Sequence, residues 1–123
     1  MKQALRGKLQ ELFDAVTDYA NNLEESGYQE QSIENTDATR GELLLRLVCE
    51  RERLLFGLKH TNTREWSCSI DDSTNKLQVM QALFHSSADL LVWLDSHDPS
   101  AQEYVILMNI IETESRFLGK ISA

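Results

Sequence analysis

The stretch that decides the fold class is residues 5–23, LRGKLQELFDAVTDYANNL. Its apolar residues recur every three or four positions, which places them along one side of an α-helix. These residues are Leu5, Leu9, Leu12, Phe13, Val16, Tyr19, Ala20 and Leu23. A helix with such a stripe buries it against other helices, so the stretch predicts one member of a helical bundle.

Three further stretches show the same period, and the four expected helices span residues 2–26, 37–60, 73–96 and 99–119. Gly27 is expected to end the first helix. The residues expected to cap the starts of the second, third and fourth helices are, in order, Thr36 or Asp37, Asp72 or Ser73, and Asp98 followed by Pro99. Residues 28–37 are expected to form a long polar connection. The short links predict an all-α, antiparallel four-helix bundle that forms a single domain over residues 1–123.

The expected packing faces follow from the same spacing. In the third helix the predicted stripe is Leu77, Met80, Leu83, Phe84, Ala88, Leu91 and Leu94, with Val92 and Trp93 outside it. In the second helix the basic residues, Arg51 among them, fall largely between the apolar positions. The link that follows is expected to pack against the bundle through Trp66 and Ile70.

The composition favours helices and excludes several classes of function. One proline and five glycines in 123 residues leave few residues for hairpin turns. The net charge of −8 disfavours nucleic acid as a partner, and no stretch is long and apolar enough to insert into a membrane. The first residues lack the apolar core of a signal peptide, so a cytoplasmic protein is expected. In that compartment Cys49 and Cys68 are expected to be reduced thiols.

The charges are unevenly distributed along this acidic chain. Residues 11–39 carry eight acids and no base, whereas residues 40–59 carry five bases and three acids. One interpretation is that the first two helices lie side by side with complementary flanks. The other is that the acidic block attracts a basic partner.

Motifs for catalysis, metal binding or cofactor binding are missing. The three histidines, His60, His85 and His97, are scattered and form no Glu-x-x-His pair or zinc spacing. The segment His85-Ser86-Ser87 with Asp89 has the residue types of a catalytic triad, but neighbours on one helix face apart. The glycines stand alone and form no phosphate-binding loop. We therefore expect no enzyme activity, no cofactor and no metal.

The last helix has more apolar residues than one buried face requires. One line holds Tyr104, Leu107, Met108, Ile111 and Leu118, and a second line holds Ile106, Ile110, Phe117 and Ile121. Either the helix is central and buried all round, or the second line pairs with another chain. That chain would be a second copy, forming a homodimer, or an amphipathic helix of a client protein. The candidate partner-binding residues are Ile106, Ile110, Phe117, Ile121, Met108 and Trp93.

Two stretches resemble a known family. The second helix contains Glu50-Arg51-Glu52-Arg53-Leu54-Leu55, and the last contains Ile106-Leu107-Met108-Asn109-Ile110-Ile111-Glu112-Thr113-Glu114-Ser115. With the size and helix order, they are similar to the FliT-type flagellar export chaperones. The resemblance implies a cytoplasmic, non-enzymatic chaperone for a secreted flagellar or type III protein, which masks an amphipathic helix of that client. The alternative hypothesis is a homo-oligomeric structural or regulatory bundle without a chaperone role.

Overall fold

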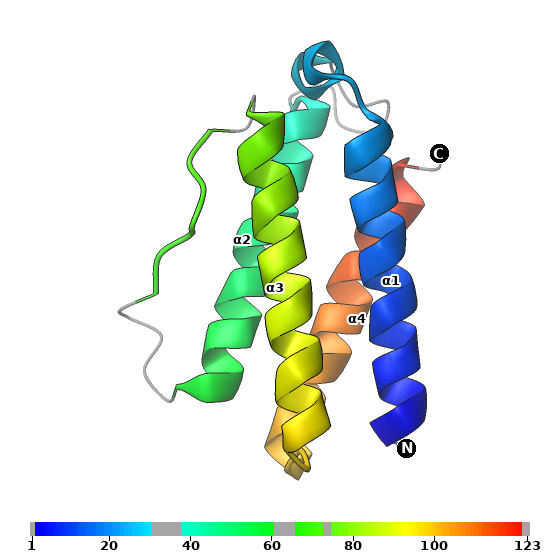
Figure 1. The fold of residues 1–123 in the computed structure, drawn as a ribbon, viewed down its shortest axis with the longest axis vertical. Coiled ribbons are helices and arrows are strands. Elements are labelled where there is room, and N and C mark those ends of the chain that lie inside the picture. Colours follow the sequence, from blue (N-terminus) through cyan, green and yellow to red (C-terminus); the bar gives the residue numbers. More distant parts are fainter. Residues whose placement is uncertain (1, 31–37, 61–65, 73–74, 122–123) are drawn as a thin grey trace.

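Four long helices form the protein. The computed structural model describes residues 2–30, 38–60, 66–72 and 75–121. The elements are α1 (Lys2–Asn22), a 3-10 helix η1 (Glu25–Gln29), α2 (Arg40–Lys59), α3 (Lys76–Ser96) and α4 (Ala101–Ile121). These residues include no strand, and the four helices pack against one another (Figure 1). The prediction of an all-α four-helix bundle is therefore confirmed.

Three of the helices begin two or three residues later than predicted, because other residues cap them. Thr39 accepts a hydrogen bond from the backbone N–H of Glu42 (3.1 Å), and Asn75 accepts one from Gln78 (3.1 Å). At α4, Ser100 and Glu103 form a reciprocal capping box, with distances of 3.2 and 2.8 Å. Of the predicted caps, Thr36, Asp37 and Ser73 lie outside the described residues.

The helix directions differ from the prediction at two pairs of neighbours. Figure 1 shows α1 and α4 running one way and α2 and α3 running the other. Antiparallel packing is confirmed for α1 with α3 and for α2 with α4. It is wrong for α2 with α3 and for α1 with α4, which are parallel neighbours. A helix of this length spans about 30 Å, which about ten extended residues can cover. The connection over residues 60–75 is long enough to return the chain to the level where α2 began.

This arrangement places α1 and α2 at opposite corners of the bundle, because α1 packs on α3 and α4. The interpretation that their charged flanks lie side by side is therefore wrong. At the start of α2, Arg40 still binds Glu30 of the acidic block at 3.2 Å, and two other cations bind α3. Arg6 of α1 binds Asp95 at 2.7 Å, and Lys59 of α2 binds Asp89 at 2.6 Å.

The buried face of α3 is rotated relative to the predicted stripe. Leu77 and Phe84 are each 67% exposed, and Ala88 is exposed as well. The residues that α3 buries are Val79, Ala82, Leu83, Ser86, Leu90, Leu91, Trp93 and Leu94. Because α3 has apolar side chains on several sides, spacing alone allows either face, and packing against α1 and α2 selects the observed one.

The two cysteines form a disulfide. Cys49 of α2 is bonded to Cys68 in the connection, so the expectation of two reduced thiols is wrong. Cys49 and Cys68 are 19 residues apart in the sequence, and compartment and cysteine count do not indicate that the chain returns parallel to α2. That return brings Cys68 alongside α2. The prediction that Trp66 and Ile70 pack against the bundle is confirmed, since Ile70 is buried and Trp66 is half-buried.

The region around Gly27 is a compact turn and not only a polar connection. Helix α1 ends at Asn22, before the expected stop, and Gly27 is buried within η1. A Cβ at Gly27 would lie 3.2 Å from Leu23 Cδ2, so the close approach favours glycine. Tyr28, placed in the connection by the sequence, is fully buried, and its hydroxyl donates to the carbonyl oxygen of Ala20 at 2.7 Å.

We expect Tyr28→Phe to lower the free energy of unfolding by about 1 kcal/mol at neutral pH, because one buried hydrogen bond is lost. Burial raises the pKa of Tyr28 to about 12, so the folded protein holds the phenol proton more tightly than the unfolded chain, where tyrosine titrates near 10. Wild-type stability should therefore fall as the pH rises from about 10 to about 12. Melting temperatures measured from pH 8 to 12 check both effects.

The variant should lose part of this alkaline decline. The remainder comes from Tyr19, whose pKa is also raised by burial, and it is present in both proteins. Identical alkaline slopes for the two proteins would contradict the buried position of the Tyr28 hydroxyl.

Candidate functional site

Three of the six candidate partner-binding residues belong to the core. Ile110 is fully buried, and Phe117 and Trp93 are 7% and 8% exposed. Phe117 meets the ring of Tyr19 edge-on at 5.9 Å. The prediction that Ile110 and Phe117 lie on a partner-facing line of the last helix is wrong, because the buried face of α4 consists of Leu107, Ile110, Glu114 and Phe117. Trp93, predicted to lie outside the main stripe of the third helix, is on the buried face of α3.

The other three candidates keep a solvent-facing side. Ile106 and Ile121 are half-buried, and Met108 is 54% exposed. Met108 projects from α4 with Val105, one turn before it, which is 61% exposed. Ile106 lines the larger of two hollows between α2 and α4.

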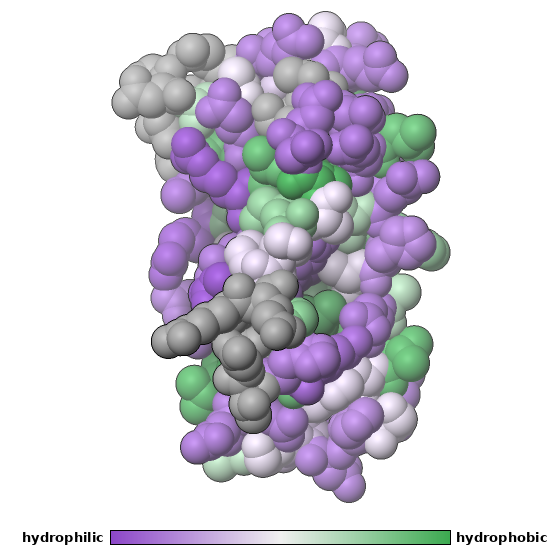
Figure 2. All heavy atoms as spheres, turned by 90° about the vertical axis from the view of Figure 1, so that its left-hand side faces the viewer, coloured by the Kyte–Doolittle hydropathy of each residue, from purple (hydrophilic) through white to green (hydrophobic). Residues whose placement is uncertain are grey.

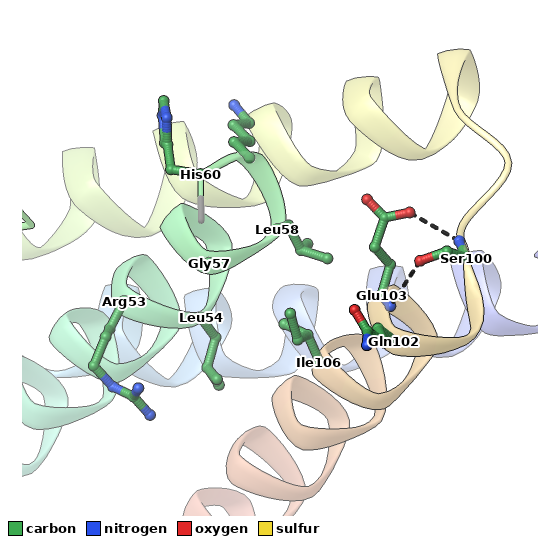
Figure 3. A pocket seen from close by; sticks show the side chains of 10 residues that line it. Arg53, Leu54, Gly57, Leu58, His60, Ser100, Gln102, Glu103 and Ile106 are labelled. Carbon is green, nitrogen blue, oxygen red and sulfur yellow. Dashed lines mark hydrogen bonds between the residues drawn. The ribbon is translucent and has the colours of Figure 1, made fainter. Parts of the chain in front are cut away.

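That hollow, which we call the α2–α4 groove, lies between the end of α2 and the beginning of α4. Its volume is about 630 Å³, and its apolar wall consists of Leu54, Leu58 and Ile106. Figure 3 shows Leu58 and Ile106 pointing into the gap between the two helices. A Cβ added at Gly57 would meet no atom within 4 Å, so the missing side chain leaves the groove open on its α2 side.

The rim of the groove is polar. Its remaining lining residues are Arg53, Lys59, His60, Ser100, Gln102 and Glu103. Arg53 pairs with Glu50, and Lys59 pairs with Asp89, so both cations already have a partner within the chain. An apolar strip with a polar, largely neutralised rim suits one face of an amphipathic helix better than a small charged ligand.

A second, smaller hollow lies along the same pair of helices, towards the other end. It has a volume of about 270 Å³ and is lined by Leu43, Arg46, Leu47, Glu50, Thr113, Arg116, Phe117 and Lys120. It shares no residue with the α2–α4 groove.

Arg51 and Glu114 form an ion pair inside the core. Both side chains are fully buried, and Arg51 Nη2 donates to Glu114 Oε1. Arg51 Nη1 also donates to Leu83 O, Ser86 Oγ and Ser87 Oγ at 3.0–3.1 Å. The guanidinium carbon lies 4.3 Å from the centroid of the Phe13 ring. The network therefore joins all four helices.

The burial of this ion pair shifts the pKa of Glu114. Loss of water raises the pKa of Glu114 above its usual range, and the charge of Arg51 opposes that rise. Arg51 Nε and Glu114 Oε2 have no hydrogen-bond partner among the described residues. Sequence reasoning missed the pair because arginine is normally solvent-exposed, although Arg51 lies four residues from both Leu47 and Leu55 on the apolar side of α2. One available signal was Ser86 and Ser87, polar residues within the buried side of an apolar helix.

A further apolar feature lies on α3. Leu77, Phe84 and Val92 are each about two-thirds exposed and are spaced seven and eight residues apart, so they share one side of the helix. Figure 2, which views the molecule over α2 and the connection, shows hydrophobic side chains at the edges and in the upper middle of a mostly hydrophilic face. These residues are separate side chains and not a hollow.

The groups that could have carried chemistry make structural contacts. Ser86 Oγ and Ser87 Oγ donate to Leu83 O at 3.2 and 2.7 Å. His97 stacks on Trp93 with ring centroids 4.8 Å apart, and His60 packs on Phe56 at 4.2 Å. Within the described ranges, no cluster of three or more His, Cys, Asp or Glu residues could hold a metal ion.

The described helices also include none that is long and apolar enough to cross a membrane. Comparison of the chain with protein-family models, curated proteins and solved structures found no match. Among the described residues, the α2–α4 groove is the feature that best suits the binding of a partner.

Proposed function

We propose that this chain is a non-enzymatic helical binding protein, a small cytoplasmic chaperone that masks an amphipathic helix of a secreted flagellar or type III protein. The observation that supports the proposal is the α2–α4 groove, with its apolar wall of Leu54, Leu58 and Ile106. An apolar ridge of a client helix fits such a groove, while the polar rim meets the polar flanks of that helix.

The energetics suit a reversible complex. Burial of about 400 Å² of apolar surface at about 25 cal/mol per Å² contributes about 10 kcal/mol before costs. Ordering the client helix and the groove side chains consumes several kcal/mol of this. The remainder corresponds to roughly micromolar affinity, which allows the client to be released for export.

Gly57 offers a test that leaves the core intact. We expect Gly57→Leu to fill the groove and to weaken client binding at least about tenfold. The matched control is Gly7→Leu on α1, where an added Cβ also meets no atom within 4 Å but where no groove lies nearby. Both changes replace a helical glycine and should keep or raise stability by about 1 kcal/mol. A loss of binding in Gly57→Leu alone therefore reports on the groove.

The measurement has two steps. The tagged chain is used to recover bound proteins from its source cells, and a labelled peptide of the recovered protein's amphipathic helix is then titrated by fluorescence anisotropy. Equal affinities for Gly57→Leu, Gly7→Leu and the unmodified chain would refute binding in the groove. Recovery of no partner at all would refute the chaperone proposal.

The second candidate function, a homo-oligomeric structural or regulatory bundle, is favoured by the exposed residues Leu77, Phe84 and Val92 on α3. Two copies packing through this side would cover apolar surface without involving the α2–α4 groove. A solution mass of twice 14.1 kDa in the absence of any other protein would favour this function.

A further inference from the structure

The connection between α2 and α3 is held on the bundle by three consecutive residues. We call residues 66–72 the crossover segment. Cys68 is bonded to Cys49, and Ile70 is buried in the core cluster formed around α2 and α3. Between them, the backbone N–H of Ser69 donates to Glu52 Oε1 at 2.8 Å, and its hydroxyl donates to Glu52 Oε2.

Both attachment points on α2 lie on one side of that helix. Cys49 and Glu52 are three residues apart, so they are neighbours on the helix surface. In Figure 1 the connection runs alongside α2. One of the three anchors is covalent, and the other two are a hydrogen-bonded pair at half-exposed Glu52 and a single buried isoleucine.

The crossover segment covers part of the boundary between α2 and α3. Leu45 and Met80 are partly buried against the same core cluster as Ile70 and Cys68. Trp66 and Ser67 form one wall of a hollow of about 310 Å³, whose other walls include Phe56 and Asp89. Displacement of the segment would uncover apolar side chains on both helices.

We propose that the Cys49–Cys68 disulfide is a redox-controlled clasp, which holds the crossover segment over the α2–α3 boundary when oxidised and releases it when reduced. Both cysteines are half-exposed, so a small dithiol reaches them. A thiolate of the dithiol attacks one sulfur and forms a mixed disulfide, which the second thiol of the dithiol resolves. The disulfide gains two electrons and two protons to give two cysteine thiols, and the dithiol becomes a disulfide.

The four-helix core should survive this reduction. Leu9, Leu90 and Leu107 are fully buried in a second cluster that contains neither cysteine nor Ile70. A disulfide stabilises a fold mainly by restricting the unfolded chain. In the folded protein its reduction leaves the crossover segment held by Glu52 and Ile70 alone, so this segment opens before the helices do. The device is independent of the proposed chaperone function, since the α2–α4 groove shares no residue with the crossover segment.

Hydrogen–deuterium exchange of the full-length protein, before and after dithiothreitol, tests the clasp. We expect the amide of Ser69 and the peptide over residues 66–72 to exchange at least about tenfold faster after reduction. The middle of α1 and of α4 should be unchanged. The double variant Cys49→Ser/Cys68→Ser should match the reduced protein and should not respond to dithiothreitol.

Three outcomes would overturn the proposal. They are unchanged exchange over residues 66–72 in the reduced protein, an equal increase across all four helices, and detection of two free thiols in the untreated protein. If the double variant fails to fold, reduction of the folded wild type still decides the question. Circular dichroism then reports whether the helices persist.

Discussion

Replacing Glu114 with Leu is expected to lower the free energy of unfolding by about 5 kcal/mol, and replacing Arg51 with Met by about 3 kcal/mol. Each change leaves one fully buried ionisable group without its partner. The two costs differ because a guanidinium cannot lose its proton at accessible pH, whereas a buried carboxyl can take one up. Burial already raises the pKa of Glu114, so the acid left by Arg51→Met becomes neutral more readily.

The double variant Arg51→Met/Glu114→Leu should regain most of the lost stability, because apolar side chains of similar size need no compensating charge. Urea unfolding of the four proteins gives the coupling energy of the pair. The exposed pair of Glu112 and Arg116 on α4 is the control, and its removal should change stability by less than about 0.5 kcal/mol. Additive losses in the double variant would contradict a buried, coupled pair.

The pH dependence of the Arg51→Met variant provides an internal check. Without the cation of Arg51, the pKa of Glu114 should be higher in the folded variant than in the unfolded chain. Its stability relative to wild type should therefore improve as the pH falls towards the ordinary pKa of glutamate. A deficit that does not change with pH would mean that Glu114 has reached solvent in the variant.

The ion pair also shows what the sequence could and could not predict. Helix number and approximate helix position follow from apolar spacing, because every helix must bury a stripe. Arg51 lies four residues from both Leu47 and Leu55, so helical spacing places it on the buried side of α2, unlike the exposed Arg53. Its partner Glu114 is 63 residues away, and no local pattern identifies that partner.

The same limit explains the other errors. The parallel arrangement of α2 and α3 is set by a connection whose path, and whose bond from Cys68 to Cys49, depends on the packed bundle. In α3, Leu77 and Phe84 satisfy the helical period as well as Val79 and Leu83 do. Of the candidate site, Ile106 was predicted to bind a partner, and the structure places it in the wall of the α2–α4 groove. Gly57 was not predicted, because an absent side chain has no periodicity to detect.

Helix α4 allows the corrected face to be tested with two substitutions two residues apart. Ile110→Asp is expected to lower the free energy of unfolding by at least about 4 kcal/mol, since it places a carboxylate where no solvent reaches and removes a fully buried side chain. Met108→Asp, at a side chain that is 54% exposed, should change stability by less than about 0.5 kcal/mol. Thermal and urea unfolding measure both.

This contrast decides how binding data on α4 are to be interpreted. If Ile110→Asp abolishes client binding, the cause is an unfolded bundle and not a damaged interface, so the substitution says nothing about a partner. Ile106→Asp, at a half-buried position in the groove wall, gives the informative result when its circular dichroism matches wild type. A stable, fully helical Ile110→Asp protein would instead mean that the line of Ile106, Ile110 and Phe117 faces outwards, which is one of the two alternatives that the sequence left open.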